Sequence, residues 1–141
     1  MARLHTPLAV MFSSTPLLQD VPPLQMRIVV ALRIAVMAGR HKRPVEPYLA
    51  GHLGSTRAAA AFTGLIHIMG DMWPDPFTVH PPCCRQTSYD EMLLLDLVTA
   101  TLRGEPDQFS GLLSDMLNAK QVRRLQQSLA SFVQEVRASS C

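Results

Sequence analysis

Residues 88–102 read SYDEMLLLDLVTATL, and this stretch decides the fold class. Ser88 followed by Glu91 is a capping box, in which the serine hydroxyl and the glutamate carboxylate each accept a hydrogen bond from backbone N–H groups of a first helical turn. The apolar residues that follow continue the helix to Leu102, and Gly104 marks its end. The stretch predicts a helix, and its surroundings predict more of them.

Two further helices are predicted on the C-terminal side. Pro106 opens the first, and Asn118 caps the second with Gln121 at the third helical position. Each has one apolar face at helical spacing. In the first, the face contains Phe109, Leu112, Leu113, Met116 and Leu117; in the second, the steps of three and four between Val122, Leu125, Leu129, Phe132 and Val136 are typical of a helix seam.

The N-terminal side predicts two helices and a long loop. Residues 71–87 contain four prolines and form the loop, and residues 56–70 form a helix with small side chains in its first half. A short helical turn fits 47–52. Residues 24–38 form a helix that is apolar on nearly every side, which is typical of a central, buried helix. Gly39 is the predicted residue that ends it.

The expected architecture is all-α. The chain of 141 residues is short enough for one domain, a bundle of about five helices over 24–138, preceded by an irregular proline-containing arm over 1–23. Charged residues make up 17% of the chain, below the usual value of about 25%. This deficit indicates either a deep core or an exposed apolar face that a partner covers.

Composition also indicates where in the cell the protein is located. The longest apolar stretch, residues 28–38, is interrupted by Arg33 and is shorter than the roughly 20 residues of a membrane span. Three cysteines do not form a disulfide framework. We therefore expect a cytoplasmic protein with no membrane association and no secretion signal.

Charge is unevenly distributed. Residues 1–57 carry seven Lys or Arg and two Asp or Glu, whereas residues 58–141 carry six and nine. The first part could attract an acidic partner, or the two parts could attract each other. Residues 40–43 are the only contiguous basic cluster, and the pI is 8.6. The sequence therefore argues against a nucleic-acid-binding protein and favours a solvated helix end.

The loop contains the one metal-binding candidate. His80, Cys83 and Cys84 offer the imidazole and thiolate ligands that suit zinc, with a fourth ligand from His67, Asp71, Asp75 or Cys141. Alternatively, the adjacent thiols are redox-active, helped by Arg85 and the N-terminus of the next helix. The structural alternative is a proline-fixed loop whose cysteines pack under Trp73.

No catalytic motif stands out. Thr63, His67 and Asp71 are spaced by four on one helix face, and a His–Asp pair is the start of an acid–base device. No partner nucleophile or GxSxG elbow accompanies them, so a polar helix edge explains the spacing equally well. We predict that the protein is not an enzyme.

The segment His80–Leu117, with HPPCC, the capped SYDEMLLLDLV and the helix start GEPDQF, resembles a group of short alphaproteobacterial helical proteins that form a domain of unknown function. The resemblance implies a bacterial cytoplasmic protein. It transfers no site residue.

These features favour a non-enzymatic regulatory or adaptor protein that acts through helix-mediated protein contacts. The alternative is a metal- or thiol-responsive protein that uses the His80, Cys83 and Cys84 loop, with zinc as the candidate cofactor. We predict a homodimer with Leu125, Leu129 and Phe132 at the centre of its interface. If that seam instead faces the chain's own helices, the dimer loses its basis.

Overall fold

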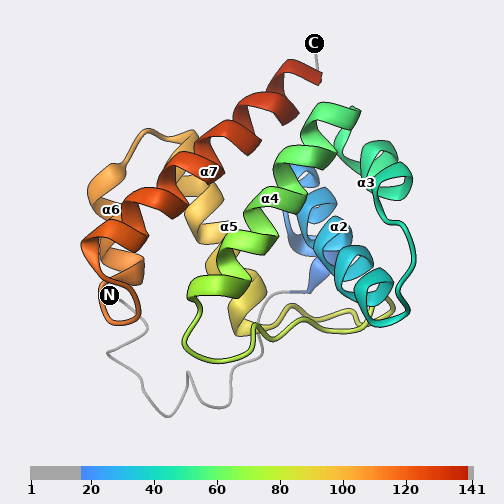
Figure 1. The fold of residues 1–141 in the computed structure, drawn as a ribbon, viewed down its shortest axis with the longest axis horizontal. Coiled ribbons are helices and arrows are strands. Elements are labelled where there is room, and N and C mark those ends of the chain that lie inside the picture. Colours follow the sequence, from blue (N-terminus) through green and yellow to red (C-terminus); the bar gives the residue numbers. More distant parts are fainter. Residues whose placement is uncertain (1–16, 140–141) are drawn as a thin grey trace.

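A computed structural model of the chain describes residues 17–139. This part of the chain is all-α, as the sequence predicts, with six α-helices instead of about five (Figure 1). The additional helix is the short turn predicted at 47–52. A 3-10 turn, η2 (Leu18–Asp20), precedes the helices, which are α2 (Pro23–Arg40), α3 (Glu46–Leu53), α4 (Thr56–Met72), α5 (Tyr89–Leu102), α6 (Pro106–Leu113) and α7 (Ala119–Ser139).

Local capping chemistry sets most of the helix starts. The capping box of α5 is present: Glu91 N–H donates to Ser88 Oγ at 3.0 Å, and Ser88 N–H donates to Glu91 Oε1 at 2.8 Å. Asn118 and Gln121 form the same reciprocal pair at the start of α7, with distances of 2.8 and 3.0 Å. Each pair satisfies backbone donors that a helix start would leave without partners. Both caps confirm the sequence prediction.

The end of α2 differs from the prediction. Gly39 lies inside the helix, which continues to Arg40. Arg43 N–H bonds the Ala38 carbonyl at 2.9 Å, and Lys42 takes the left-handed conformation with φ of 54°. This is the hydrogen-bonding pattern of a Schellman end, with a lysine in the position that usually holds glycine. The prediction that Gly39 ends the helix is wrong, because a glycine is tolerated within a helix when the residues that follow it set the helix end.

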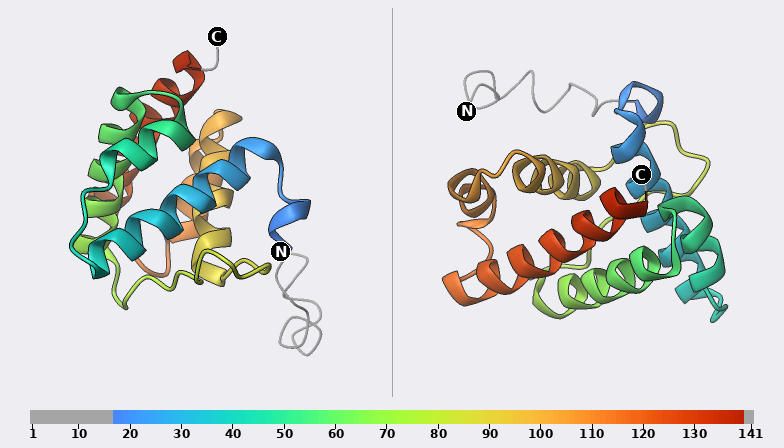
Figure 2. Two further views of the ribbon diagram at one scale, coloured as in Figure 1. Left: turned by 90° about the vertical axis from the view of Figure 1, so that its right-hand side faces the viewer. Right: turned by 90° about the horizontal axis from the view of Figure 1, so that it is seen from above.

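The helices pack in a closed ring around one core. α2 packs on α3, α3 on α4, α4 on α7, α7 on α5 and α6, and α5 again on α2. Figure 2 shows this arrangement from two sides. The prediction that residues 24–38 form a central helix is therefore wrong, because α2 is one wall of the ring. A helix that forms part of such a ring has only one side facing the core.

The pairing of α4 with α7 places the predicted dimer seam inside the chain. Leu125, Leu129 and Phe132 are each fully buried, and the Phe132 ring lies 5.0 Å from the ring of Phe62 on α4. Nothing of these three side chains remains for a second copy to contact, so they are core residues and not the centre of an interface. The alternative that the seam faces the chain's own helices holds, with α4 as its main neighbour.

The segment before α2 is partly fixed. Residues 1–16 of the predicted arm lie outside the described residues. Residues 17–22 are held against the long loop: Leu17 pairs with Gln86 in an isolated antiparallel bridge, and Leu18 N–H donates to the Arg85 carbonyl at 2.6 Å. The loop and the start of α2 therefore support each other.

Candidate functional site

A buried ion pair holds the long loop against α2. Arg33 donates two hydrogen bonds to the carboxylate of Glu91, at 2.8 and 3.0 Å, and both side chains are fully buried. Arg33 also donates to the carbonyls of Cys84 and Gln86, at 2.6 and 2.7 Å. One guanidinium thus connects α2, the loop and the capping box of α5.

The chemistry of this cluster is structural. The hydrogen bond with Glu91 raises the pKa of Arg33, and burial, which lowers it, is the weaker influence. A guanidinium that is charged at every accessible pH and fully paired with acceptors has no proton to exchange with a substrate. The position of Arg33 within an apolar helix was a hint of this cluster, because a buried arginine needs a partner. The identity of that partner, 58 residues away, was not evident.

The candidate metal ligands do not gather into a centre. Among residues 17–139, no three His, Cys, Asp or Glu side chains lie together in a way that could hold a metal ion. Cys83 is exposed and Cys84 half-buried, both as free thiols, and Trp73 packs edge-on to Phe77 at 5.2 Å. The exposure of Cys83 excludes its packing under Trp73. Cys141 lies outside the described residues, and thiol reactivity stays a prediction.

The polar edge of α4 has no catalytic partner within the described chain. His67 and Asp71 approach to 3.8 Å, but both are largely exposed, and the Thr63 hydroxyl donates to the Ala59 carbonyl of its own helix. The group has the geometry of a solvated helix edge, in which water screens the charges.

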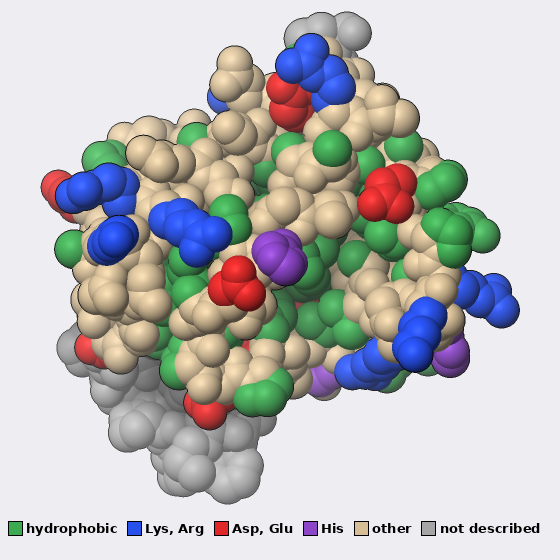
Figure 3. Space-filling model, in the orientation of Figure 1, with side chains coloured by type: hydrophobic (Ala, Val, Ile, Leu, Met, Phe, Trp, Pro, Cys, Tyr) green, Lys and Arg blue, Asp and Glu red, His purple; other side chains and the backbone are tan. Residues whose placement is uncertain are grey.

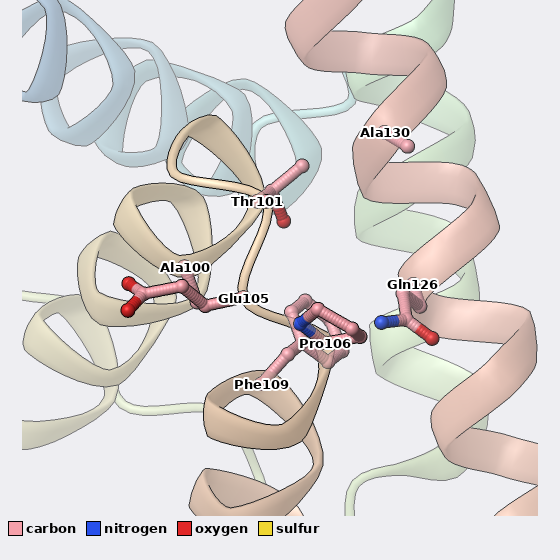
Figure 4. A pocket seen from close by; sticks show the side chains of 8 residues that line it. Ala100, Thr101, Glu105, Pro106, Phe109, Gln126 and Ala130 are labelled. Carbon is pink, nitrogen blue, oxygen red and sulfur yellow. The ribbon is translucent and has the colours of Figure 1, made fainter.

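A hollow lies between the α5–α6 turn and α7 (Figure 4). It measures about 220 Å³ and is lined mainly by small and apolar groups around Pro106 and Phe109, with the Gln126 amide on the α7 side. The Glu105 carboxylate points away from Gln126 (Figure 4). The lining also includes the Thr101 hydroxyl, which donates to the Leu97 carbonyl of its own helix at 2.9 Å.

The outer side of α2 presents an apolar stripe. It consists of Met26, Val30, Ile34 and Met37, which follow one another at steps of four, four and three and so share one helix face. Met37 is exposed, and Met26, Val30 and Ile34 are half-buried. Within residues 17–139, none of the four is among the core residues or those packed against the core, in contrast to Ile28, Val29 and Leu32 on the other side of the helix. In Figure 2 (left), α2 crosses the side of the molecule turned to the viewer. We call these four residues the outer stripe.

The outer stripe leads into a groove between the end of α2 and the start of α3. The groove measures about 370 Å³, and its lining includes the apolar residues Ile34, Met37 and Tyr48 together with His41 and Arg43. Met37 and Tyr48 are 43% and 63% exposed, which places them among the most exposed large apolar side chains of the described residues. Figure 3 shows Lys, Arg and His side chains gathered where α2 ends.

Sequence reasoning missed the outer stripe, although its signal was present. A helix that is apolar on every side and belongs to a small domain has more apolar surface than its neighbours can cover. The low charge content indicated an uncovered face but did not locate it.

Comparisons of the chain with protein-family models, with curated proteins and with solved structures found no match. The resemblance of His80–Leu117 to alphaproteobacterial proteins stays a prediction. None of the helices within residues 17–139 combines the length and the apolar character that crossing a membrane requires.

Proposed function

We propose that the protein is a non-enzymatic adaptor that binds a helical segment of another protein along the outer stripe of α2. The observation that carries this proposal is the placement of Met26, Val30, Ile34 and Met37 on one helix face outside the core. Water contact with such a face is unfavourable, and its removal by a partner gains about 25 cal/mol for each Å² of apolar surface.

The shape of the stripe favours a helix as the bound element. Side chains spaced by three and four form the ridges that pack into the grooves of a second helix at an interaxial distance of about 8–10 Å. Two of the four residues are methionines, whose flexible side chains adapt to differently shaped partners. A helix laid along the stripe would also cover the adjoining groove at Met37 and Tyr48.

The chemistry of the other candidate sites in the described chain agrees with a non-enzymatic role. The Arg33–Glu91 pair is internally satisfied, and the His67–Asp71 pair is exposed. In the hollow near Phe109, the Thr101 hydroxyl is hydrogen-bonded to its own helix. Binding through an apolar helix face needs none of these groups.

The test is a selection of helical peptides from a random displayed library, with the full chain as bait. We expect Met37→Gln to weaken binding of the selected peptides about tenfold, since it replaces an exposed apolar contact with a polar side chain of similar size. Ala60→Gln, at an exposed position of α4, is the matched control and should leave the affinity unchanged.

Equal binding to wild type and to Met37→Gln would overturn the proposal. The solution mass of the protein is measured in parallel. A wild-type homodimer that dissociates in Met37→Gln would make a second copy the occupant of the stripe, and the hetero-partner role would be wrong.

A further inference from the structure

We infer that the helix bound along the outer stripe is acidic, with an apolar anchor in the groove at Tyr48 and carboxylates against residues 40–43. This inference rests on the proposed function and adds the chemistry of the partner to it. Four observations carry it: the unpaired cations at this site, the strained lysine among them, the apolar lining of the groove beside them, and the charge of the competing occupants.

The first observation is a charge inventory. Residues 21–70 contain six Lys or Arg and one acidic residue, Glu46. Three of the six cations are engaged: Arg33 with Glu91, Arg57 with Glu135 at 3.4 Å, and Arg27 with the His52 carbonyl at 2.8 Å. The remaining three, Arg40, Lys42 and Arg43, are exposed and form no ion pair within residues 17–139. We call these three residues the basic rim.

The second observation is the backbone at Lys42. Its φ of 54° is a conformation that costs a residue with a Cβ about 1 kcal/mol or more, and glycine avoids this cost. A lysine at this position keeps a third cation between His41 and Arg43, both of which line the groove. The strain is explained if the charge has a use at this site.

The third observation concerns the groove itself. Its apolar lining from Ile34, Met37 and Tyr48 lies directly beside His41 and Arg43. A ligand that satisfies both parts has an apolar side chain for the groove and negative charge next to it. An acidic amphipathic helix combines the two on one face, at the spacing of the outer stripe.

Charge also argues against two occupants from the chain itself. Residues 1–16 contain Arg3 and His5 but no Asp or Glu, so this segment would bring no negative charge to the basic rim. A second copy pairing through α2 would bring another helix without acidic residues, because residues 23–40 contain none. Like charges facing each other across an interface disfavour binding.

The experiment uses a displayed library of amphipathic helices whose apolar positions are fixed and whose flanking positions vary freely among Asp, Glu, Lys, Arg and Ser. The baits are the wild-type chain and a variant with Arg40→Glu, Lys42→Glu and Arg43→Glu. We expect the wild type to enrich Asp and Glu, and the variant to enrich Lys and Arg instead. The matched control carries Lys120→Glu, Arg123→Glu and Arg124→Glu, three exposed changes on α7, and should select the same peptides as the wild type.

The strongest acidic peptide is then titrated against single variants. We expect Arg40→Ala and Arg43→Ala to weaken its binding about two- to fivefold each, as for exposed ion pairs. Raising the salt concentration should weaken the binding to wild type more than the binding to the rim variant.

The outcomes separate the inference from the proposed function. Selected peptides without an acidic preference that still need Met37 would overturn the acidic partner and leave the adaptor role standing. Peptides whose binding is independent of Met37 would overturn both. Binding of the wild type to vesicles of anionic phospholipid, with loss in the rim variant and no acidic peptide selected, would assign the rim to a lipid surface and overturn the inference.

Discussion

The inner face of α7 and the outer stripe of α2 are both rows of apolar residues at helical spacing, yet only one of them holds the fold together. Leu125, Leu129 and Phe132 on α7 are fully buried by α4 and its neighbours. Met26 and Met37 on α2 lie outside the core. The comparison teaches that spacing predicts an apolar face but does not predict what covers it.

The difference follows from the number of apolar sides on each helix. Around the seam, α7 carries exposed polar residues such as Arg123, Arg124 and Gln127, so it has a single apolar face, which the core requires. α2 has apolar residues on both sides and neighbours, α3 and α5, that cover only the inner one. The second apolar side lies outside the core, and it is the side that we propose a partner covers.

The largest expected effect is a loss of stability when the buried Arg33 on α2 is replaced. Arg33→Met leaves the Glu91 carboxylate buried without its guanidinium, and we expect it to lower the free energy of unfolding by about 3–5 kcal/mol. Urea denaturation followed by circular dichroism measures this. Adding Glu91→Gln removes the stranded charge and should restore part of the loss. A loss below about 1 kcal/mol in Arg33→Met would show that the pair does not hold the loop.

The second prediction compares the two rows directly. Leu129→Ala opens a cavity between α7 and α4 and should cost about 3 kcal/mol of stability. Met37→Ala removes a side chain that is 43% exposed and lies outside the core, and should cost less than about 1 kcal/mol. Equal losses in the two variants, measured in urea, would contradict the division between folding and binding faces.

Much of the fold could be predicted because its signals are local. The capping pairs Ser88 with Glu91 and Asn118 with Gln121 involve residues three positions apart, so the sequence shows both partners at once. The cover of a face depends on residues far away in the chain. The α7 seam is covered by α4, which lies about 60 residues earlier in the chain. From the spacing alone, we predicted that a second copy of the chain covers this seam.

A third prediction uses two glycines with opposite roles. Gly54 joins α3 to α4 with φ of 100°, and a Cβ there would lie 2.8 Å from the Cβ of Ser139 at the end of α7. Gly54→Ala should therefore destabilise the protein by about 1–3 kcal/mol. Gly39, within α2, has open space around it, and Gly39→Ala should stabilise by about 0.5–1 kcal/mol. Thermal unfolding of the two variants shows whether each substitution stabilises or destabilises the protein. A Gly54→Ala variant that is more stable than wild type would contradict the close approach of Gly54 to Ser139.

The candidate site was less predictable than the fold. His80, Cys83 and Cys84 attracted attention because their side chains have distinctive chemistry, whereas the outer stripe consists of common apolar residues. The stripe becomes recognisable only when the ring of helices shows which side of α2 is covered. Arg40–Arg43 was visible as a cluster, but the groove beside it depends on the position of Tyr48 on α3.

The smallest predicted effect concerns Lys42. Lys42→Gly relieves the left-handed backbone and should raise the free energy of unfolding by up to about 1 kcal/mol. The same change removes one cation of the basic rim, so we expect it to weaken binding of an acidic peptide while it stabilises the fold. A variant that is less stable than wild type, as measured by urea denaturation, would contradict the strain at this position.

The measurement that tests the central claim most directly is methyl NMR of methionine-labelled protein during titration with an acidic helical peptide from the selection. Met26 and Met37 report on the outer stripe, and Met69 and Met72 report on the core side of α4. We predict that the signals of Met26 and Met37 shift as the peptide saturates the protein, while those of Met69 and Met72 stay in place. Signals of Met26 and Met37 that remain unchanged at saturation would contradict the assignment of this face as the binding surface.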